Sequence, residues 1–321
     1  MIHPIPPGTR DVLPDEMREL RALAARLREL FEGAGYGEVR TPALEYEDVL
    51  RHGDERAASA PFRLFDEHGR VLVLRSDMTI PIARLVATRY ADAEPPLRFC
   101  YFQHAYRTPE RGRTSSEFLQ GGIELIGVPE TAGEVELLAL TAESLAAVGL
   151  RRYRIGVGDG GLYRTLLAEL EVAEDERVPL LELLTERRYV ELEAQVERLG
   201  LSDSARSLLV ELPRVRGGAE VLEHDAGPAA AAVEGLRALH SGLDEWGIAD
   251  RVIFDLGLVR ELDYYTGAVF EVYDPAVGFA LGGGGRYDGL LSRYGRDLPA
   301  CGLALDLQAV HVAQAEEEHL R

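Results

Sequence analysis

Lysine and asparagine are absent from this sequence of 321 residues, so all 35 of its basic residues are arginines. Without lysine the chain has no amine side chain for Schiff-base chemistry, no anchor for pyridoxal phosphate and no Walker-A motif. Without asparagine it has no N-glycosylation site. Codon bias in a GC-rich genome is the simplest cause of both absences, and the exclusions hold whatever the cause.

Cysteines, long apolar runs and an excess of basic charge are also lacking. Cys100 and Cys301 lie far apart, so we expect neither a cysteine zinc cluster nor a disulfide framework. No apolar run approaches the ~18 residues of a membrane span, and the N-terminus lacks the pattern of a signal peptide. The net charge of -20 opposes broad binding of phosphate backbones. We therefore expect a cytoplasmic protein that binds neither membrane nor nucleic acid.

The hydrophobic pattern predicts strands on both sides of a helical middle. Helices are predicted at 14–31, 80–90 and 130–148, over most of 160–247, and from about residue 307. Strands are predicted at 39–44, where Pro42 suits an edge, at 62–65 and 71–74 as a hairpin, and at 97–107, 118–126, 251–259, 267–273 and 301–307. Hairpins and long loops prevail over strand-helix-strand alternation, which favours an α+β fold with an antiparallel sheet and a helical insertion.

The strand predicted at 118–126 carries the clearest candidate for chemistry. Its period of two places Gln120, Gly122 and Glu124 on one face. Glycine in a strand often marks close approach by a ligand or by backbone. An amide and a carboxylate beside such a gap can hold the amino group of a small molecule. The same pattern also fits an ordinary solvent-facing side of a sheet, and the residues alone leave both interpretations open.

Arginine and short polar side chains mark two further candidate segments. The arginine-rich loop that begins at Arg107 suits a carboxylate or phosphate, because the guanidinium binds such groups through two parallel hydrogen bonds, but it also fits a solvated hairpin loop. Asp77 and Thr79 stand where a strand meets a helix. There they either bind a ligand or cap the helix.

Tyrosines and glycines dominate the remaining two segments. Arg260, Tyr264 and Tyr265 precede a turn glycine, and the tyrosines fit either a ligand-facing wall or a core whose hydroxyls are satisfied. The four glycines before Arg286 and Tyr287 lack the lysine of a P-loop and the spacing of a dinucleotide fingerprint, so we expect a glycine-rich turn there. The eight histidines show no paired metal-ligand spacing, and we expect no metal site.

Taken together and in order, five segments resemble the catalytic domain of class II histidyl-tRNA synthetases. They are PPGTRDVLP at 6–14, LRSDMT at 74–79, the arginine loop with EFLQGGIELIG at 117–127, RELDYYTGAVFEVY at 260–273, and GGGGRYDGLL at 282–291. The resemblance covers about residues 4–310. It implies a six-stranded antiparallel sheet flanked by helices, with a mostly helical insertion at about 171–247 and dimerisation through the first motif.

The resemblance also implies a pocket for histidine or a similar amino acid. The positions that match the family pattern are Asp77, Thr79, Arg107, Gln120, Glu124, Arg260, Tyr264, Tyr265 and Tyr287. One of them departs from the usual residue, since the family usually has glutamate where this sequence has Asp77. The pocket is otherwise largely intact, and no cofactor is expected.

The nucleotide part of the pattern is broken. Ala309 stands where the synthetases have an arginine that holds ATP phosphates, and an alanine cannot supply that charge. Ser116 replaces an arginine before Glu117, and Glu261 replaces the glycine after Arg260. We also expect no anticodon-binding domain, because the class II synthetase-like domain fills residues 1–321.

This combination is similar to the regulatory subunits of ATP phosphoribosyltransferase, which are paralogues of the synthetases. The resemblance implies a non-catalytic chain that forms a homodimer within a hetero-oligomer with a short-form catalytic subunit. The complex would perform the first step of histidine biosynthesis, with feedback inhibition by L-histidine. A minimal ligase that activates an amino acid with ATP, and a stand-alone amino-acid sensor, are the alternatives.

Overall fold

The computed structural model describes residues 5–54, 62–107, 115–260 and 264–320. Its first helix, α1 (Pro14–Gly33), confirms the helix expected at 14–31. Leu20, Leu23, Leu27 and Phe31 repeat every three or four residues and are all buried, so one stripe of the helix faces the core. Pro14 fits the first turn, where a missing N–H costs no helical hydrogen bond.

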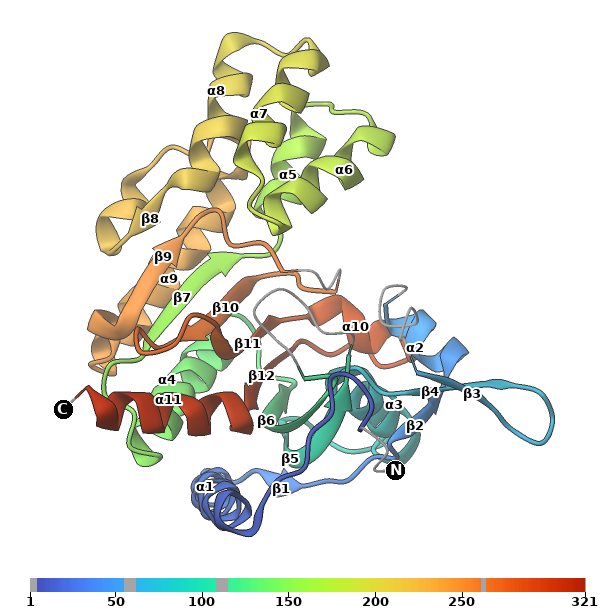
Figure 1. Cartoon of the computed structure of the whole chain (residues 1–321). Helices are drawn as coiled ribbons and strands as arrows, with labels where there is room; N and C mark the ends of the chain where they lie inside the picture. The colour runs from blue at the N-terminus through green and yellow to red at the C-terminus, as the bar shows by residue number, and fades with distance from the viewer. Residues whose placement is uncertain (1–4, 55–61, 108–114, 261–263, 321) are drawn as a thin grey trace.

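A large sheet forms the centre of the molecule (Figure 1). Six neighbouring strands pair antiparallel throughout, in the order β5 (Leu97–Tyr106), β6 (Glu117–Ile126), β12 (Ala300–Asp306), β11 (Ala280–Arg286), β10 (Ala268–Tyr273) and β7 (Arg154–Asp159). In the described residues β1 (Gly37–Glu38) is added parallel to β5, and β9 (Val252–Asp255) parallel to β7, with β8 (Arg216–Gly217) beyond it. The expected six-stranded antiparallel arrangement is confirmed, and three short strands extend it.

The glycine-rich segment is a central strand, and the prediction of a turn there was wrong. Gly282, Gly283 and Gly284 lie in β11 and pair on both sides. A Cβ added to Gly284 would stand 1.9 Å from the carbonyl oxygen of Gly302. The glycines are therefore explained by close packing of neighbouring backbones.

Two of the predicted strands need smaller corrections. Residues 39–44 do not form one strand, because β1 ends at Glu38 and β2 (Leu44–Tyr46) begins at Leu44. Pro42 lies between them, and its carbonyl oxygen accepts a hydrogen bond of 2.8 Å from Arg75 Nη1. The strand expected at 251–259 ends at Asp255, where the chain turns.

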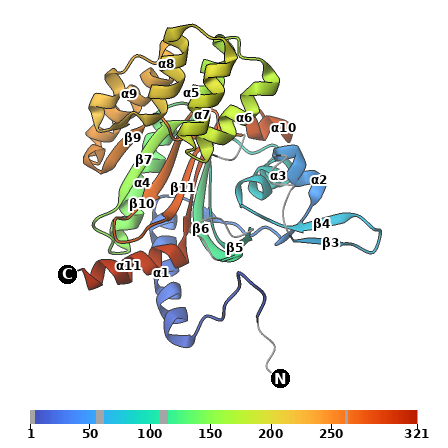
Figure 2. The same ribbon diagram turned by 45° about the horizontal axis from the view of Figure 1, so that its top comes forward.

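A second, three-stranded sheet stands beside the large one (Figure 2). Its order is β2, β4 (Val71–Leu74), β3 (Arg63–Phe65), and the β3–β4 hairpin is the one predicted. The chain passes directly from β4 into α3 (Thr79–Arg89). This junction brings Asp77 and Thr79 to one face of the large sheet.

Helices cover both faces of the large sheet. α1, α4 (Ala132–Ala147), α9 (Ala230–Glu245) and α11 (Leu307–His319) pack with one face in the larger apolar core. α2 (Glu47–Gly53), α3 and α10 (Asp288–Arg293) pack with the other face in a smaller core that contains Tyr101, Tyr264, Tyr265 and Tyr287. The aromatic and polar residues of the predicted pocket belong to this second face.

Between β7 and β9 the chain is mainly helical, at the top of Figure 1. The helices are α5 (Leu162–Glu169), α6 (Glu174–Thr185), α7 (Tyr189–Val196), α8 (Asp203–Glu211) and α9. Short connections join α5 to α8, whereas β8 and short 3-10 helices stand between α8 and α9. Ser202 caps α8, since its Oγ accepts a hydrogen bond from the Ala205 N–H at 3.3 Å. Nowhere in the described ranges is a helix both long and apolar enough to cross a membrane.

Candidate functional site

Glu124 lies at the centre of the second face of the sheet. Its carboxylate is 1 % exposed and accepts hydrogen bonds from two side chains, Thr79 Oγ1 at 2.9 Å and the hydroxyl of Tyr287. Gly302 on the neighbouring strand makes room for it, because a Cβ there would lie 1.9 Å from Glu124 Oε2. Burial raises the pKa of Glu124 to about 8, against the two hydrogen bonds, which lower it.

Four tyrosines surround this carboxyl group. The ring centroids of Tyr264 and Tyr265 are 4.8 Å apart, and those of Tyr264 and Tyr287 are 5.7 Å apart in an edge-to-face arrangement. Tyr101, which no sequence motif singled out, is the fourth. A Cβ added to Gly122 would stand 2.4 Å from its hydroxyl oxygen, so the glycine of the predicted strand makes room for Tyr101.

The Asp77 carboxylate has a structural role that the sequence pattern left open. It caps the first turn of α3, because Oδ1 accepts a hydrogen bond of 3.1 Å from the Ile80 N–H. Asp77 is also 5 % exposed, and its negative charge is one of the influences that raise the pKa of Glu124. Capping the helix and shaping the electrostatics of the pocket are therefore compatible.

In the described structure no hydrogen bond or ion pair to Glu124 is formed by three further pocket residues, Arg107, Arg260 and Gln120. Arg107 donates a hydrogen bond of 2.7 Å from Nε to the Ser76 carbonyl oxygen, and its positive charge reaches Tyr101. Arg260 pairs with Glu271 at 2.8 Å and lies close to Tyr265. Each arginine thus has a partner of its own and influences one tyrosine of the group electrostatically.

Gln120 lies on the same face of β6 as Glu124, as the alternation predicted, but four residues before it along the strand. Its Oε1 is buried and has no hydrogen-bond partner among the described residues. The arginines of the loop at 108–114 and Glu261 lie outside the described residues.

The far end of the same face is built differently. Asp306, in register with Gln120, caps α11 by accepting hydrogen bonds from the N–H groups of Gln308 at 3.0 Å and Ala309 at 3.1 Å. The Gln308 side chain accepts a hydrogen bond of 3.0 Å from the Leu119 N–H. Ala309 itself is 8 % exposed and packs in the larger core.

Among the described residues, Arg10 is a cation near that end. The negative charge of Asp306 helps to raise the pKa of Arg10. The Arg10 guanidinium is already paired with Glu16, because its Nη1 donates a hydrogen bond of 2.8 Å to Glu16 Oε2. The described end therefore offers helix-capping groups and a paired arginine where the synthetase pattern has a phosphate-binding arginine.

This geometry suits binding of a small cationic or zwitterionic molecule beside Glu124. An ammonium group would compensate the carboxylate, the tyrosines would enclose an apolar part, and Arg107 and Arg260 stand within reach of the same aromatic walls. In the part of the chain that the structure describes, no three histidine, cysteine, aspartate or glutamate side chains come together in a way that could hold a metal ion.

The family model described as histidyl-tRNA synthetase matches residues 8–310. A curated protein from Desulforamulus reducens, named ATP phosphoribosyltransferase regulatory subunit, is 39% identical over 314 residues, which cover 96% of this chain and 78% of that protein. A solved structure from Bacillus halodurans C, described as an ATP phosphoribosyltransferase regulatory subunit/histidyl-tRNA synthetase, has a TM-score of 0.89 and 33% identity, over 98% of this chain and 84% of that chain.

A further solved structure carries a different name on the same fold. It is described as a histidine–tRNA ligase subunit from Alicyclobacillus acidocaldarius, with a TM-score of 0.83 and 32% identity, and it covers 99% of this chain and 99% of that chain. The class II synthetase-like fold implied by the five motifs is thereby confirmed. The chain belongs to the histidyl-tRNA synthetase family and, within it, to the ATP phosphoribosyltransferase regulatory subunits.

Proposed function

We propose that this chain is the non-catalytic regulatory subunit of an ATP phosphoribosyltransferase complex and that L-histidine is its effector. Catalysis would belong to a partner, a short-form catalytic subunit in the cytoplasm. The observation that carries the proposal is a contrast between two neighbouring strands. Glu124 on β6 is buried and held by Thr79 and Tyr287 in a pocket that suits an amino acid, whereas Ala309, just after β12, stands where an ATP-activating enzyme needs a cation.

The effector would bind at Glu124, with its ammonium group against the carboxylate. The pocket would comprise Asp77, Thr79, Arg107, Gln120, Glu124, Arg260, Tyr264, Tyr265 and Tyr287. A cation beside Glu124 favours the ionised form of a carboxyl group whose pKa is about 8 in the empty pocket. Binding at neutral pH would therefore be accompanied by release of a proton.

Inhibition would follow from a difference in affinity. If the pocket binds histidine more tightly in one quaternary arrangement of the complex than in another, histidine shifts the population toward the first. A homodimer of this chain inside the hetero-oligomer would give each complex at least two such pockets.

The decisive experiment is phosphoribosyl transfer to ATP by a short-form catalytic subunit from the same source, with and without this chain. Activation that histidine then suppresses is the expected result. No change in rate at saturating chain would refute the regulatory role. A chain that activates but leaves the complex insensitive to histidine would refute only the effector assignment.

A minimal ligase that activates an amino acid with ATP is the second candidate. It is favoured by one observation, the name histidine–tRNA ligase subunit given to a relative of the same length and fold. It predicts histidine-dependent exchange of pyrophosphate into ATP by the chain alone. Exchange no faster than in a sample without protein would eliminate it.

A further inference from the structure

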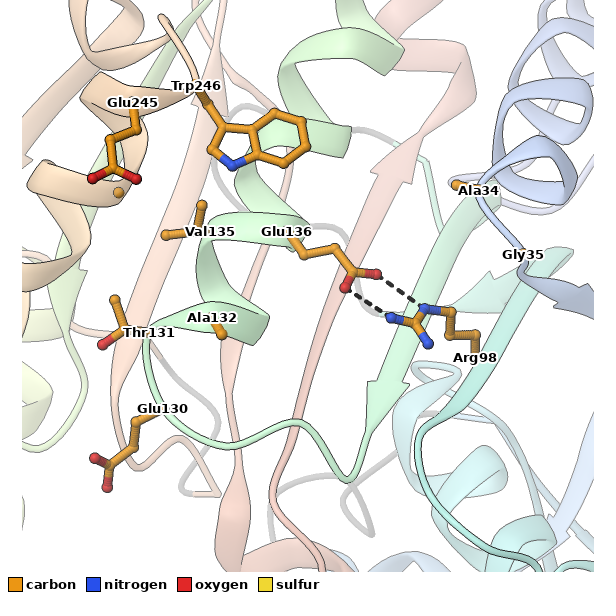
Figure 3. A pocket seen from close by; sticks show the side chains of 11 residues that line it. Ala34, Gly35, Arg98, Glu130, Thr131, Ala132, Val135, Glu136, Glu245 and Trp246 are labelled. Atoms are coloured by element: carbon orange, nitrogen blue, oxygen red, sulfur yellow. Dashed lines mark hydrogen bonds and ion pairs between the residues drawn. The ribbon is translucent and has the colours of Figure 1, made fainter.

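A concave region lies among α1, α4 and α9, the helices that cover the face of the large sheet opposite to the Glu124 pocket. Figure 3 shows the side chains that line it. It is a cavity of about 940 Å³ between the end of α1, the first turns of α4 and the last turn of α9, and we name it the Trp246 groove. Its volume is near the top of the range for small-molecule sites, roughly 300–1,000 Å³, which is room for several residues of a polypeptide.

The floor of the Trp246 groove is held rigidly by one ion pair. Arg98 on β5 donates to both carboxylate oxygens of Glu136 on α4, from Nε at 3.1 Å and from Nη2 at 2.9 Å. The Tyr36 hydroxyl donates a third hydrogen bond to Glu136 at 2.9 Å. Figure 3 shows the two side chains meeting across the groove. Arg98 is thus neutralised and leaves no positive charge to attract an anion.

Two further carboxylates leave the groove negative. Glu130, before α4, and Glu245, at the end of α9, are exposed and line the cavity. Neither has an ion-pair partner among the described residues. With Arg98 and Glu136 compensating each other, the lining carries two uncompensated negative charges.

Trp246 gives the groove an aromatic anchor. It is the one tryptophan of the chain, and its side chain is 63 % exposed although tryptophan is usually largely buried. In Figure 3 its ring projects from the end of α9 over the groove, next to Glu245. An indole face beside carboxylates is a favourable environment for a guanidinium or ammonium group, and exposed tryptophans often anchor protein interfaces.

We propose that the Trp246 groove docks an arginine- or lysine-bearing segment of the partner catalytic subunit. The identity of that partner rests on the proposed function, whereas the basic character of the segment rests on the charge and the aromatic ring of the groove. The cation stacks on Trp246 and pairs with Glu130 or Glu245, and the remainder of the segment fills the cavity above the Arg98–Glu136 pair.

Docking at this position has a physical route to Glu124. Thr131, in the groove wall, donates its N–H to Glu134 Oε2 at 3.0 Å. Glu134 Oε1 lies 3.0 Å from Arg286 Nε and accepts the Ala268 N–H at 3.2 Å. Arg286 immediately precedes Tyr287, whose hydroxyl donates to Glu124. Polar contacts therefore run from the groove wall to Arg286, and the peptide bond between Arg286 and Tyr287 completes the connection to the pocket.

The wall residue Thr131 is itself held in an unusual conformation. Its φ is 58°, in the left-handed region that a β-branched residue rarely adopts. The capping box with Glu134 holds it there. A segment that pulls on Thr131 would consequently be felt at Glu134 and Arg286.

The single tryptophan makes the groove directly observable. The chain is labelled with 5-fluorotryptophan, so that its ¹⁹F spectrum has one resonance from Trp246, and is titrated with unlabelled catalytic subunit. We expect the resonance to shift or broaden on assembly. In parallel, the double variant Glu130→Gln/Glu245→Gln and the single variant Trp246→Ala should each raise the Kd of the complex at least tenfold, and the double variant should also weaken its dependence on salt.

The matched control removes two charges elsewhere. Glu174→Gln/Asp175→Asn, on the exposed start of α6, should change the Kd by less than twofold. If the wild-type complex forms while the resonance stays unmoved and the groove variants bind as tightly as wild type, the docking proposal is wrong and the proposed function stands.

Two other outcomes would also overturn the docking proposal. If the wild-type chain neither binds nor activates the catalytic subunit, the proposed function fails and the docking partner fails with it. If the resonance instead follows the concentration of the chain alone, and the groove variants halve its mass in solution, the groove is an interface between two copies of this chain.

Discussion

At the Glu124 end of the sheet face, buried polar side chains bond mainly to other side chains, whereas at the Asp306 end they bond to the backbone. Glu124 is held by Thr79 and Tyr287. Asp306 is held by the first N–H groups of α11, and Gln308 by a strand N–H. The two ends lie on neighbouring strands and use similar residue types.

This difference decides which end can bind a ligand. The polar groups at Glu124 can exchange a side-chain partner for a ligand, and those at Asp306 cannot. A hydroxyl that serves Glu124 can turn toward a ligand, and the ligand can replace it. A carboxylate that caps a helix is needed there whether or not a ligand is present, because the N–H groups would otherwise be unsatisfied. The end with Ala309 therefore serves stability, whereas the pocket at Glu124 suits a ligand.

The largest expected effect is a pH dependence of the unfolding free energy that originates at Glu124. The pKa of Glu124 is raised to about 8 in the folded chain from an ordinary value of 4.5, so the folded state binds this proton more tightly than the unfolded state. The contribution to stability is complete below pH ~4.5 and is lost as the pH rises through about 8. One pKa unit corresponds to about 1.4 kcal/mol, so the shift of Glu124 contributes up to ~5 kcal/mol to the free energy of unfolding.

The measurement is chemical denaturation of wild type and Glu124→Gln from pH 5 to pH 9. The difference between the two unfolding free energies isolates the titration of Glu124 from that of all other groups. A difference that stays constant across this range would show that the carboxyl group titrates as an exposed one.

A steric clash with the backbone between β11 and β12 should destabilise both ends of the site together. Gly284→Ala places a Cβ 1.9 Å from the Gly302 carbonyl oxygen, at the junction of β11 and β12. We expect the free energy of unfolding to fall by about 3 kcal/mol, since the strands must separate. Gly33→Ala, where a Cβ meets nothing within 4 Å, is the control and should leave it nearly unchanged. Equal stabilities of the two variants would contradict the packing described for β11.

Removing one charge should weaken the histidine binding proposed for the Glu124 end and leave the Asp306 end unaffected. Glu124→Gln keeps the shape of the side chain but cannot compensate an ammonium group, so histidine should bind roughly 30- to 150-fold more weakly, as expected for a charged hydrogen bond of about 2–3 kcal/mol. Isothermal calorimetry measures the Kd. Gln308→Ala, at the other end of the face, should leave it within twofold, and a similar loss in both variants would remove the distinction between the two ends.

The smallest effect concerns the Asp306 end. Ala309→Arg forces a long side chain into a buried position and should destabilise the chain by about 1–3 kcal/mol, read from thermal unfolding. Histidine binding should be unchanged. We expect pyrophosphate exchange to remain at background, because the neighbouring Asp306 and Gln308 stay committed to the helix and the strand. Exchange that appeared on this single replacement would show that the end still accepts ATP.

Alternation of side chains made much of this site predictable. Apolar residues at regular spacing identified α1, the β3–β4 hairpin and β6, and the period of two was sufficient to put Gln120 and Glu124 on one face. The five motifs then gave the class II fold. Asp77 was correctly placed at the start of a helix, although the sequence could not decide between a cap and a ligand.

Glycine and long-range contacts explain what the sequence did not yield. β11 and β7 were missed because Gly282, Gly284 and Gly156 carry no side chains on which a hydrophobic pattern could be seen. Tyr101 was missed because its approach to Gly122 depends on strand register. Glu134 and Arg286 are about 150 residues apart in the sequence, and the local sequence around either residue does not indicate their ion pair.

The short strands at the borders of the large sheet have a consequence for the behaviour of the protein in solution. β1 and β8 are only two residues long, and each contains a charged residue and a glycine. Glu38 in β1 also forms a salt bridge with Arg28, with 2.7 Å between Glu38 Oε2 and Arg28 Nε. Strands this short offer almost no backbone of their own for another strand to pair with, which disfavours edge-to-edge association of the sheet into fibrils. Assembly with partners is thereby directed to side-chain surfaces.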